Sequence, residues 1–176
     1  MKNKPLAPVL YARSAIQFVA TVLAIGAAGW AHADSPQRVP PLPKYQQECA
    51  ACHLAYPPGM LPAASWKRLM GSLDKHYGTD ASLDEASVRE ISGWLQTHAG
   101  TYKRVSEEPP QDRITRSQWF VRKHSEVDPQ IWKQAAVKSA ANCAACHTAA
   151  DKGSFRESEI QFPKGLDARF RRNWSD

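Results

Sequence analysis

The chain has 176 residues, of which 43% are hydrophobic, and it carries 23 lysines and arginines against 17 acidic residues. Three of the basic residues and none of the acidic ones fall in the first 33 positions, so the rest of the chain has a net charge of only +3. Such a small excess disfavours a nucleic-acid partner. The mean hydropathy is −0.51, and no apolar run after residue 33 approaches the length of a membrane span. We therefore expect no stable membrane insertion of this part.

Residues 1–33 have the plan of a secretory signal peptide. A basic start precedes an apolar stretch at residues 15–30, and Ala31-His32-Ala33 follows it as a small-residue cleavage site. The alternative is an uncleaved membrane anchor, but the apolar stretch is shorter than the ~20 residues that a spanning helix needs. We therefore expect export from the cytoplasm and cleavage after Ala33.

Further along the chain, apolar residues recur every three or four positions, with proline-rich breaks between the periodic segments. This pattern predicts helices at residues 44–53, 66–77, 83–97, 115–127 and 131–137. Ser65 is the expected N-cap of the second helix, and Gly78 is expected to end it. No segment has the alternating pattern of a strand. The predicted fold is all-α, with short helices and irregular connections.

Two copies of the pentapeptide CAACH, at residues 49–53 and 143–147, contain every cysteine in the chain. C-x-x-C-H is the signature of covalent c-type haem attachment. Two cysteines three positions apart lie within about one helical turn, so both sulfurs reach the vinyl groups on one edge of a porphyrin. The histidine that follows supplies the proximal iron ligand. The motifs thus predict two covalently bound haem c groups, with the attachment residues Cys49, Cys52, Cys143 and Cys146 and the proximal ligands His53 and His147.

Other chemistries use the same motif. A single C-x-x-C-H also suits a thioredoxin-like redox pair, a disulfide or half of a zinc site. However, 90 residues separate Cys52 from Cys143, which is unusual for a zinc ribbon. Zinc would also leave the histidine of each motif unexplained. Two haems are therefore the favoured interpretation.

The stretch at residues 107–110, Glu-Glu-Pro-Pro, is the best candidate for a linker. It divides the exported chain into an N-terminal haem module at residues 34–106 and a C-terminal haem module at residues 111–176. Each module has few large apolar residues. A buried porphyrin is therefore expected to supply much of the apolar volume of each core.

Helical spacing does not determine which residue binds the opposite face of each iron. His76, His98 and His124 each follow an apolar residue at helical spacing, so all three are candidates. Met60 and Met70 compete with them, because Met/His ligation is common in cytochromes c. A histidine on an apolar face is more often a core residue than a ligand. Spacing alone therefore leaves the choice open.

The chain resembles the small periplasmic dihaem cytochromes c. The matching stretches are ECAACHLAYPPGMLPAASWKRLM, LDKHYGTDASLD, WFVRKHSEV and VKSAANCAACHTAADKGSF. Members of that family have two histidines on each iron. The resemblance implies that His53 is paired with His76 and that His147 is paired with His124. His98 falls outside the matching stretches, which suggests a residue at a helix end.

The resemblance also implies the function of a periplasmic electron carrier. Two imidazoles saturate an iron and leave no position for oxygen or peroxide, and without methionine the reduction potentials should be low among cytochromes c. The implied partners are a membrane-bound cytochrome b as donor and a small soluble haem protein as acceptor. The competing interpretation is a small dihaem enzyme or ligand-binding protein of peroxidase type, in which one iron site opens.

Two further sets of side chains are candidates for contacts outside the iron sites. Residues near the expected ligands are candidates for contacting the haem propionates, although a solvated helix face explains them equally well; they are Trp66, Arg68, Arg122 and Lys123. The basic and aromatic cluster at residues 169–174 is a candidate docking patch for a redox partner. A ragged terminus would explain that cluster as well.

Overall fold

Helices and short 3-10 turns make up the secondary structure of residues 39–173, the part of the chain that the computed structural model describes. This range contains two isolated bridges between single residues and no strand. The expected all-α fold is confirmed. The residues described from Pro40 onward belong to one compact unit. The predicted signal peptide, residues 1–33, lies outside the described residues.

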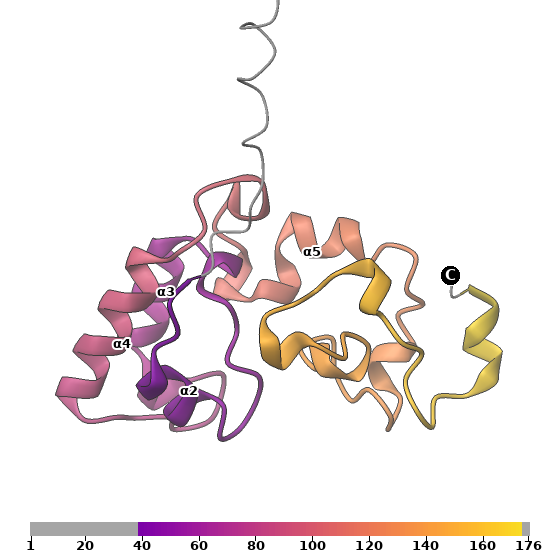
Figure 1. The fold of residues 1–176 in the computed structure, drawn as a ribbon, viewed down its shortest axis with the longest axis horizontal. Helices are drawn as coiled ribbons and strands as arrows, with labels where there is room; N and C mark the ends of the chain where they lie inside the picture. The colour runs from indigo at the N-terminus through magenta and orange to yellow at the C-terminus, as the bar shows by residue number, and fades with distance from the viewer. Residues whose placement is uncertain (1–38, 174–176) are drawn as a thin grey trace, which may run out of the picture. The chain divides into compact units, whose positions relative to one another are not determined.

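Figure 1 shows the α-helices of the described range. They are α2 (Pro43–Cys49), α3 (Ala63–Met70), α4 (Glu85–Thr97) and α5 (Gln118–Lys123). α3 and α4 pack against each other, and α2 also contacts α4. Beyond α5 the described chain makes only 3-10 turns and irregular connections, coloured orange to yellow in Figure 1. None of the helices in residues 39–173 is long and apolar enough to cross a lipid bilayer.

α4 is the longest of these helices, and it begins at a strong cap. The Oδ1 atom of Asp84 accepts hydrogen bonds from two backbone N–H groups of the first turn, both at 3.0 Å. These groups have no partner within the helix, so a capping carboxylate stabilises its start. Ile91 and Leu95 lie four positions apart and are both fully buried. The helix agrees with the expected range, 83–97, to within two residues.

α3 begins earlier than expected, and its start does not depend on Ser65. Pro62 is the N-cap residue, and it makes no side-chain capping bond. Ser65 instead lies inside the helix, fully buried, where its hydroxyl oxygen accepts a hydrogen bond from the Arg68 guanidinium at 3.3 Å. The expectation that Ser65 caps the helix is therefore wrong.

α3 also ends earlier than expected: the residue that follows its last turn is Gly71, whereas the expected end was at Gly78. The Ser72 hydroxyl donates to the Arg68 carbonyl oxygen at 2.9 Å and so competes with continuation of the helix. A separate 3-10 turn (Leu73–Lys75) then leads to His76, which lies after that turn. The periodicity suggested that His76 shares a helix face with the apolar residues of α3. It does not, because it lies outside that helix.

The second half of the chain is less helical than its apolar periodicity predicts. α5 covers only part of the expected range 115–127, and a 3-10 turn (Ile131–Lys133) replaces the helix expected at 131–137. The Ser117 hydroxyl oxygen caps α5 by accepting from the backbone N–H of Phe120 at 3.1 Å. Helices this short are marginal on their own, so this half depends on tertiary packing for its stability.

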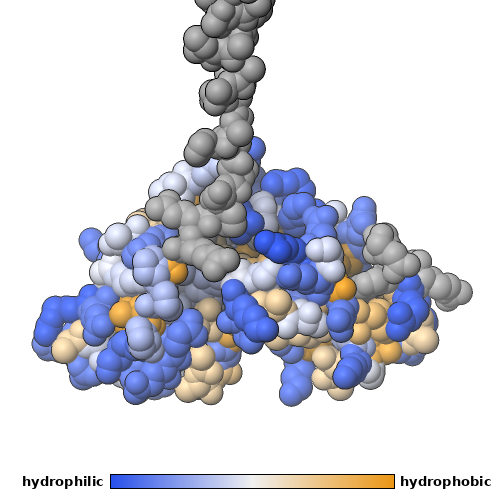
Figure 2. Space-filling view, viewed as in Figure 1, coloured by the Kyte–Doolittle hydropathy of each residue, from blue (hydrophilic) through white to orange (hydrophobic). Residues whose placement is uncertain are grey.

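The described residues form two separate apolar clusters. The first packs around α3 and α4, and its buried members are Tyr45, Ala55, Leu61, Trp66, Met70, Ile91 and Leu95. The second is smaller, and its buried members are Ile131, Val137, Leu166 and Phe170. The face seen in Figure 2 is mostly polar, with scattered apolar side chains. Such small clusters agree with the expectation that a bound porphyrin supplies core volume.

The expected linker, residues 107–110, makes specific contacts with the N-terminal half of the chain. Glu108 lies 2.7 Å from the Arg68 guanidinium. Just beyond the linker, Asp112 binds the same guanidinium through both carboxylate oxygens, at 2.6 and 2.9 Å. The Tyr77 hydroxyl donates to the backbone oxygens of Gln111 and Asp112. Residues 111–112 are therefore held against the first half, and the division into two modules stays a prediction.

We predict opposite effects of alanine at two glycines. A Cβ atom on Gly100 would lie 2.6 Å from the Gly59 carbonyl oxygen and 2.7 Å from a Val105 methyl group. Gly100→Ala should therefore lower the free energy of unfolding by about 1–3 kcal/mol. In α4 nothing lies within 4 Å of such an atom on Gly93, so Gly93→Ala should raise it by about 0.5–1 kcal/mol. Urea denaturation of the haem-loaded protein measures the free energy of unfolding of both variants. Equal changes in the two variants would contradict the close approach at Gly100.

We also predict a pH-dependent role for Asp112. Hydrogen bonding to Arg68 lowers the pKa of this carboxyl below its ordinary value. A lowered pKa means that the stabilisation is complete above the unfolded-state pKa and is lost as the pH falls through the folded-state value. Asp112→Asn should lower the free energy of unfolding by about 1 kcal/mol at pH 7. In urea titrations the difference from the unchanged protein should narrow as the pH falls from about 5 towards 2, and a constant difference would exclude this origin.

Candidate haem sites

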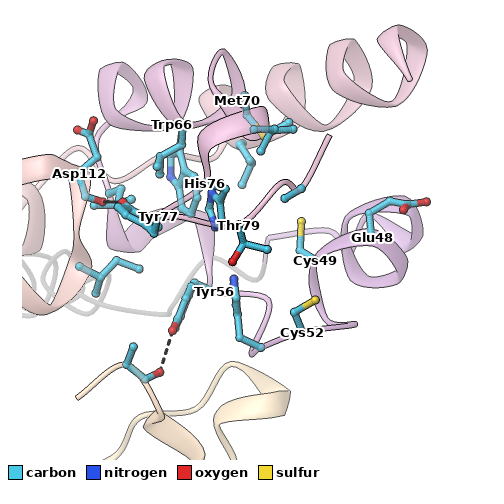
Figure 3. A pocket seen from close by; sticks show the side chains of 18 of the residues that line it. Glu48, Cys49, Cys52, Tyr56, Trp66, Met70, His76, Tyr77, Thr79 and Asp112 are labelled. Atoms are coloured by element: carbon cyan, nitrogen blue, oxygen red, sulfur yellow. Dashed lines mark hydrogen bonds between the residues drawn. The ribbon is translucent and has the colours of Figure 1, made fainter. Parts of the chain in front are cut away.

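The first CAACH motif lies where α2 ends. Cys49 is the last residue of this helix, and its side chain packs against the first apolar cluster. Cys52 and His53 follow in a turn and are exposed. Figure 3 shows Cys49 and Cys52 as neighbours at one end of a pocket. The helix end thus presents both sulfurs to the same space, as attachment to one porphyrin edge requires.

His76 lies opposite His53. Their ring centroids are 6.1 Å apart, and the ring planes differ by only 19°. An imidazole nitrogen binds a first-row metal at about 2.0 Å and lies roughly 1.15 Å from the centre of its ring, so two imidazoles on opposite sides of one metal have centres about 6.3 Å apart. The observed spacing therefore fits one iron between the two rings.

His124 and His147 form a second pair with the same spacing. Their ring centroids are 6.2 Å apart, but their planes differ by 73°. His124 is the C-cap residue of α5, and its ring stacks on Phe120 with 4.0 Å between centroids. Phe155 lies 5.4 Å from the His147 ring. The second pair is thus placed by aromatic packing around both of its members.

Hydrogen bonds fix one ring in each pair. The Nδ1 atom of His53 lies 2.7 Å from the Leu54 carbonyl oxygen, and that of His124 lies 2.9 Å from the Phe120 carbonyl oxygen. A carbonyl oxygen only accepts, so Nδ1 carries the proton in both rings and leaves the lone pair on Nε2 for a metal.

The other ring of each pair has an unpartnered nitrogen. The Nδ1 atoms of His76 and His147 are buried, and within the described residues neither has a hydrogen-bond partner. Such atoms are rare in folded proteins and call for a specific explanation, such as a bound ion near the same group. Each pair therefore has one ring, His53 or His124, whose free Nε2 lone pair fits the haem iron that the motifs imply, and a second ring with a buried nitrogen that no protein group engages.

The protonation of three of these histidines also suits metal binding. Burial is the largest cause that lowers the pKa of His76, His124 and His147 below the ordinary value of histidine. The opposite histidine lowers the pKa of His76 and of His147 further. A lower pKa keeps the imidazole neutral at neutral pH, which is the form that binds a metal.

The structure places the other candidate ligands differently. The Nδ1 atom of His98 bonds the Trp94 carbonyl oxygen at 2.8 Å, and its ring packs 5.4 Å from the Trp94 ring. His98 is the C-cap residue of α4. Met60 is buried, with 6% of its surface exposed, and Met70 belongs to the first apolar cluster. The sequence left these three residues open, and the ring pairs contain none of them.

A cavity of about 520 Å³ surrounds the first pair, within the range of ~300–1,000 Å³ that is usual for ligand sites. Figure 3 shows it with His76, Trp66, Met70 and both cysteines around it. Its apolar wall includes side chains from α3 and α4, namely Trp66, Leu69, Met70 and Leu95. Two residues of the second half, Ala141 and Cys143, also line it. The shape and lining suit a large flat apolar group with one polar edge.

Arg113 is a site residue that the sequence did not point to. It lines the cavity, and its guanidinium carbon lies 4.0 Å from the centre of the Tyr77 ring. The propionate candidate Arg68 is instead held by Glu108 and Asp112. Arg113 is therefore better placed to meet an anionic group at the edge of the cavity. It lies 60 positions after His53 in sequence, so spacing gave no signal for it.

The thiols do not have the properties of reactive cysteines. All four cysteines are free of disulfides. Burial raises the pKa of Cys49 and of Cys146 to about 11, and it also raises the pKa of Cys143. Burial therefore favours the neutral thiol over the thiolate in these three cysteines.

Comparison with known proteins supports the haem interpretation. The sequence profile of the family described as "Dihaem cytochrome c" matches residues 45–155. One match is the crystal structure of DHC purified from Rhodobacter sphaeroides, whose sequence is 47% identical to this chain. The two structures superpose with a TM-score of 0.58, and the match covers 66% of this chain and 99% of that one. A second structure, a diheme cytochrome c from Rhodobacter sphaeroides, is 44% identical with a TM-score of 0.59, covering 66% and 98%.

A structure from a different organism gives the same result. The new diheme cytochrome type c from Shewanella baltica OS155 is 33% identical to this chain, with a TM-score of 0.60, and the match covers 69% of this chain and 95% of that one. No curated protein matches the sequence.

We predict that replacing His76 opens an iron site and that replacing His98 does not. In the reduced His76→Ala protein, carbon monoxide should bind one haem per chain and shift its Soret band, because one axial position has lost its ligand. His98→Ala serves as the matched control, since its ring packs on Trp94, and its spectrum should not change with carbon monoxide. Binding by the His98 variant, with none by the His76 variant, would reverse the assignment.

Proposed function

Because the chain belongs to the dihaem cytochrome c family, with two covalently bound haem c groups that transfer electrons, we propose that it is a periplasmic carrier with two histidines on each iron. In this proposal Cys49 and Cys52 attach the first haem, and Cys143 and Cys146 attach the second. We define the first haem site as these first two cysteines with His53 and His76. The second haem site comprises Cys143, Cys146, His124 and His147.

One observation carries the proposed ligation. Two separate histidine pairs have ring centroids 6.1 and 6.2 Å apart, close to the separation of about 6.3 Å expected for imidazoles on opposite sides of one metal. In both pairs one ring belongs to the histidine of a CAACH motif, as the attachment of haem at that motif requires.

Bound haem supplies an iron that alternates between the ferrous and ferric states. His53 and His76 would hold the first iron, and His124 and His147 the second, in both oxidation states. A carbonyl oxygen orients one histidine of each pair, the Leu54 oxygen for His53 and the Phe120 oxygen for His124. Because no ligand has to leave, little rearrangement accompanies electron transfer. Histidine in place of methionine also favours low reduction potentials.

We further propose the route of the electrons. The donor is a membrane-bound cytochrome b, and the acceptor is a small soluble haem protein. Export through the signal peptide at residues 1–33 would place the carrier in the periplasm, where the family is typically found. A carrier of this kind must dock briefly and leave, which suits small, charge-guided contacts with each partner.

Electron paramagnetic resonance of the oxidised protein at low temperature tests the ligation, and the two ring geometries predict two different signals. Nearly parallel rings both interact with one of the two iron d orbitals that share π symmetry, whereas perpendicular rings interact with one orbital each. We therefore expect a rhombic low-spin signal from the first site, with its 19° angle, and a signal dominated by one large g value from the second site, with its 73° angle. The two should have equal intensity.

A high-spin signal in the native protein would contradict the proposed ligation. Rapid stoichiometric binding of carbon monoxide by the reduced protein would do the same, and it would favour the peroxidase-like alternative, in which one histidine leaves its iron. Mass spectrometry must also show a mass increase equal to two haems, since the electron paramagnetic resonance experiment presupposes both.

A further inference from the structure

Tyr56 connects the two haem sites, and neither motif assigns a role to it. Its hydroxyl donates a hydrogen bond of 2.8 Å to the carbonyl oxygen of Ala141, 85 positions later in the chain. Figure 3 draws this bond between the pocket of the first site and the segment that leads into the second motif. Ala141 lies only two residues before Cys143, the first attachment residue of the second site.

The acceptor end of this bond belongs to the second haem site. The Cys143 Sγ atom lies 3.7 Å from the same Ala141 oxygen. The segment is held in the second half of the chain, because the Asn142 side chain donates to the carbonyl oxygen of the buried Val137 at 2.9 Å. Cys143 also lines the cavity of the first site. The second thioether therefore adjoins the first porphyrin pocket.

The donor end belongs to the first haem site. The Tyr56 ring stacks on the His53 ring, with centroids 5.2 Å apart and planes within 27°. The carbonyl oxygen of Tyr56 accepts a hydrogen bond of 2.7 Å from the hydroxyl of the buried Tyr45. Burial, with a smaller contribution from Cys143, raises the pKa of Tyr56 to about 12. The hydroxyl is therefore protonated and able to donate at neutral pH.

We propose that Tyr56 is a positioning residue that docks the second CAACH segment on the first haem site and provides the bonded route between the two irons. The route runs from Cys143 along the backbone to the Ala141 carbonyl, across the hydrogen bond to the Tyr56 hydroxyl, and from Tyr56 along residues 54–55 to His53. Electrons tunnel more readily along bonds and hydrogen bonds than across gaps. One electron passes from a ferrous iron, which becomes ferric, to a ferric iron, which becomes ferrous. Tyr56 keeps its proton and is not itself oxidised.

This inference rests on the proposed function, and its test uses the haem-loaded protein. Tyr56→Phe keeps the ring on His53 and removes only the hydroxyl. After flash reduction of a small fraction of the protein, equilibration between the haems should be about three- to tenfold slower in the variant than in the unchanged protein. In denaturant titrations we expect the spectral changes of the two haems to coincide in the unchanged protein and to separate in the variant, because the contact between the sites is weakened.

Thr148→Val is the matched control. The Thr148 hydroxyl also donates to a backbone carbonyl oxygen, that of Glu159 at 3.1 Å, but this bond lies within the second half of the chain. Its loss should leave the equilibration rate within twofold of the unchanged protein. An equal slowing by both variants, or equilibration and denaturation unchanged in Tyr56→Phe, would overturn the inference. The electron paramagnetic resonance signals of the same samples report separately whether the bis-histidine ligation itself is correct.

Discussion

The facing of two imidazole rings beside each CAACH motif, with centroids 6.1 and 6.2 Å apart, is the feature on which the proposed haem sites depend. In both pairs 23 positions separate the two histidines, yet the order is reversed: His53 of the first motif precedes His76, whereas His147 of the second motif follows His124. The two halves therefore reach the same ring spacing through different local structure, a 3-10 turn before His76 and the end of α5 before His124.

The thin packing of the chain agrees with the same proposed sites. The second apolar cluster has only four buried members, and short turns surround it. A chain that wraps a large apolar group buries its surface against that group, so it needs fewer contacts between helices. The α-helices of the described residues lie at the proposed haem sites: α2 ends at Cys49, α3 and α4 pack together beside the first cavity, and α5 ends next to His124.

Several local features were readable from the sequence and others were not. The apolar spacing that includes Ile91 and Leu95 identified α4 to within two residues, whereas the Asp84 cap was found only in the structure. The same periodicity extended α3 too far, because it carries no information about the Ser72 hydroxyl that bonds back to Arg68. The apolar spacing at 131–137 also predicted a helix where the chain makes only a 3-10 turn, although Ile131 and Val137 are both buried in the second cluster.

The sequence by itself determined the cofactor chemistry, because two cysteines and a histidine within five positions act together whatever the surrounding fold. Only the tertiary structure decided which histidines face each other, why His98 packs on Trp94 instead, and that Arg113 lines the first cavity. It alone brought Tyr56 to Ala141. These relations join residues far apart in the chain, and their distances depend on how the whole chain packs, which periodicity does not encode.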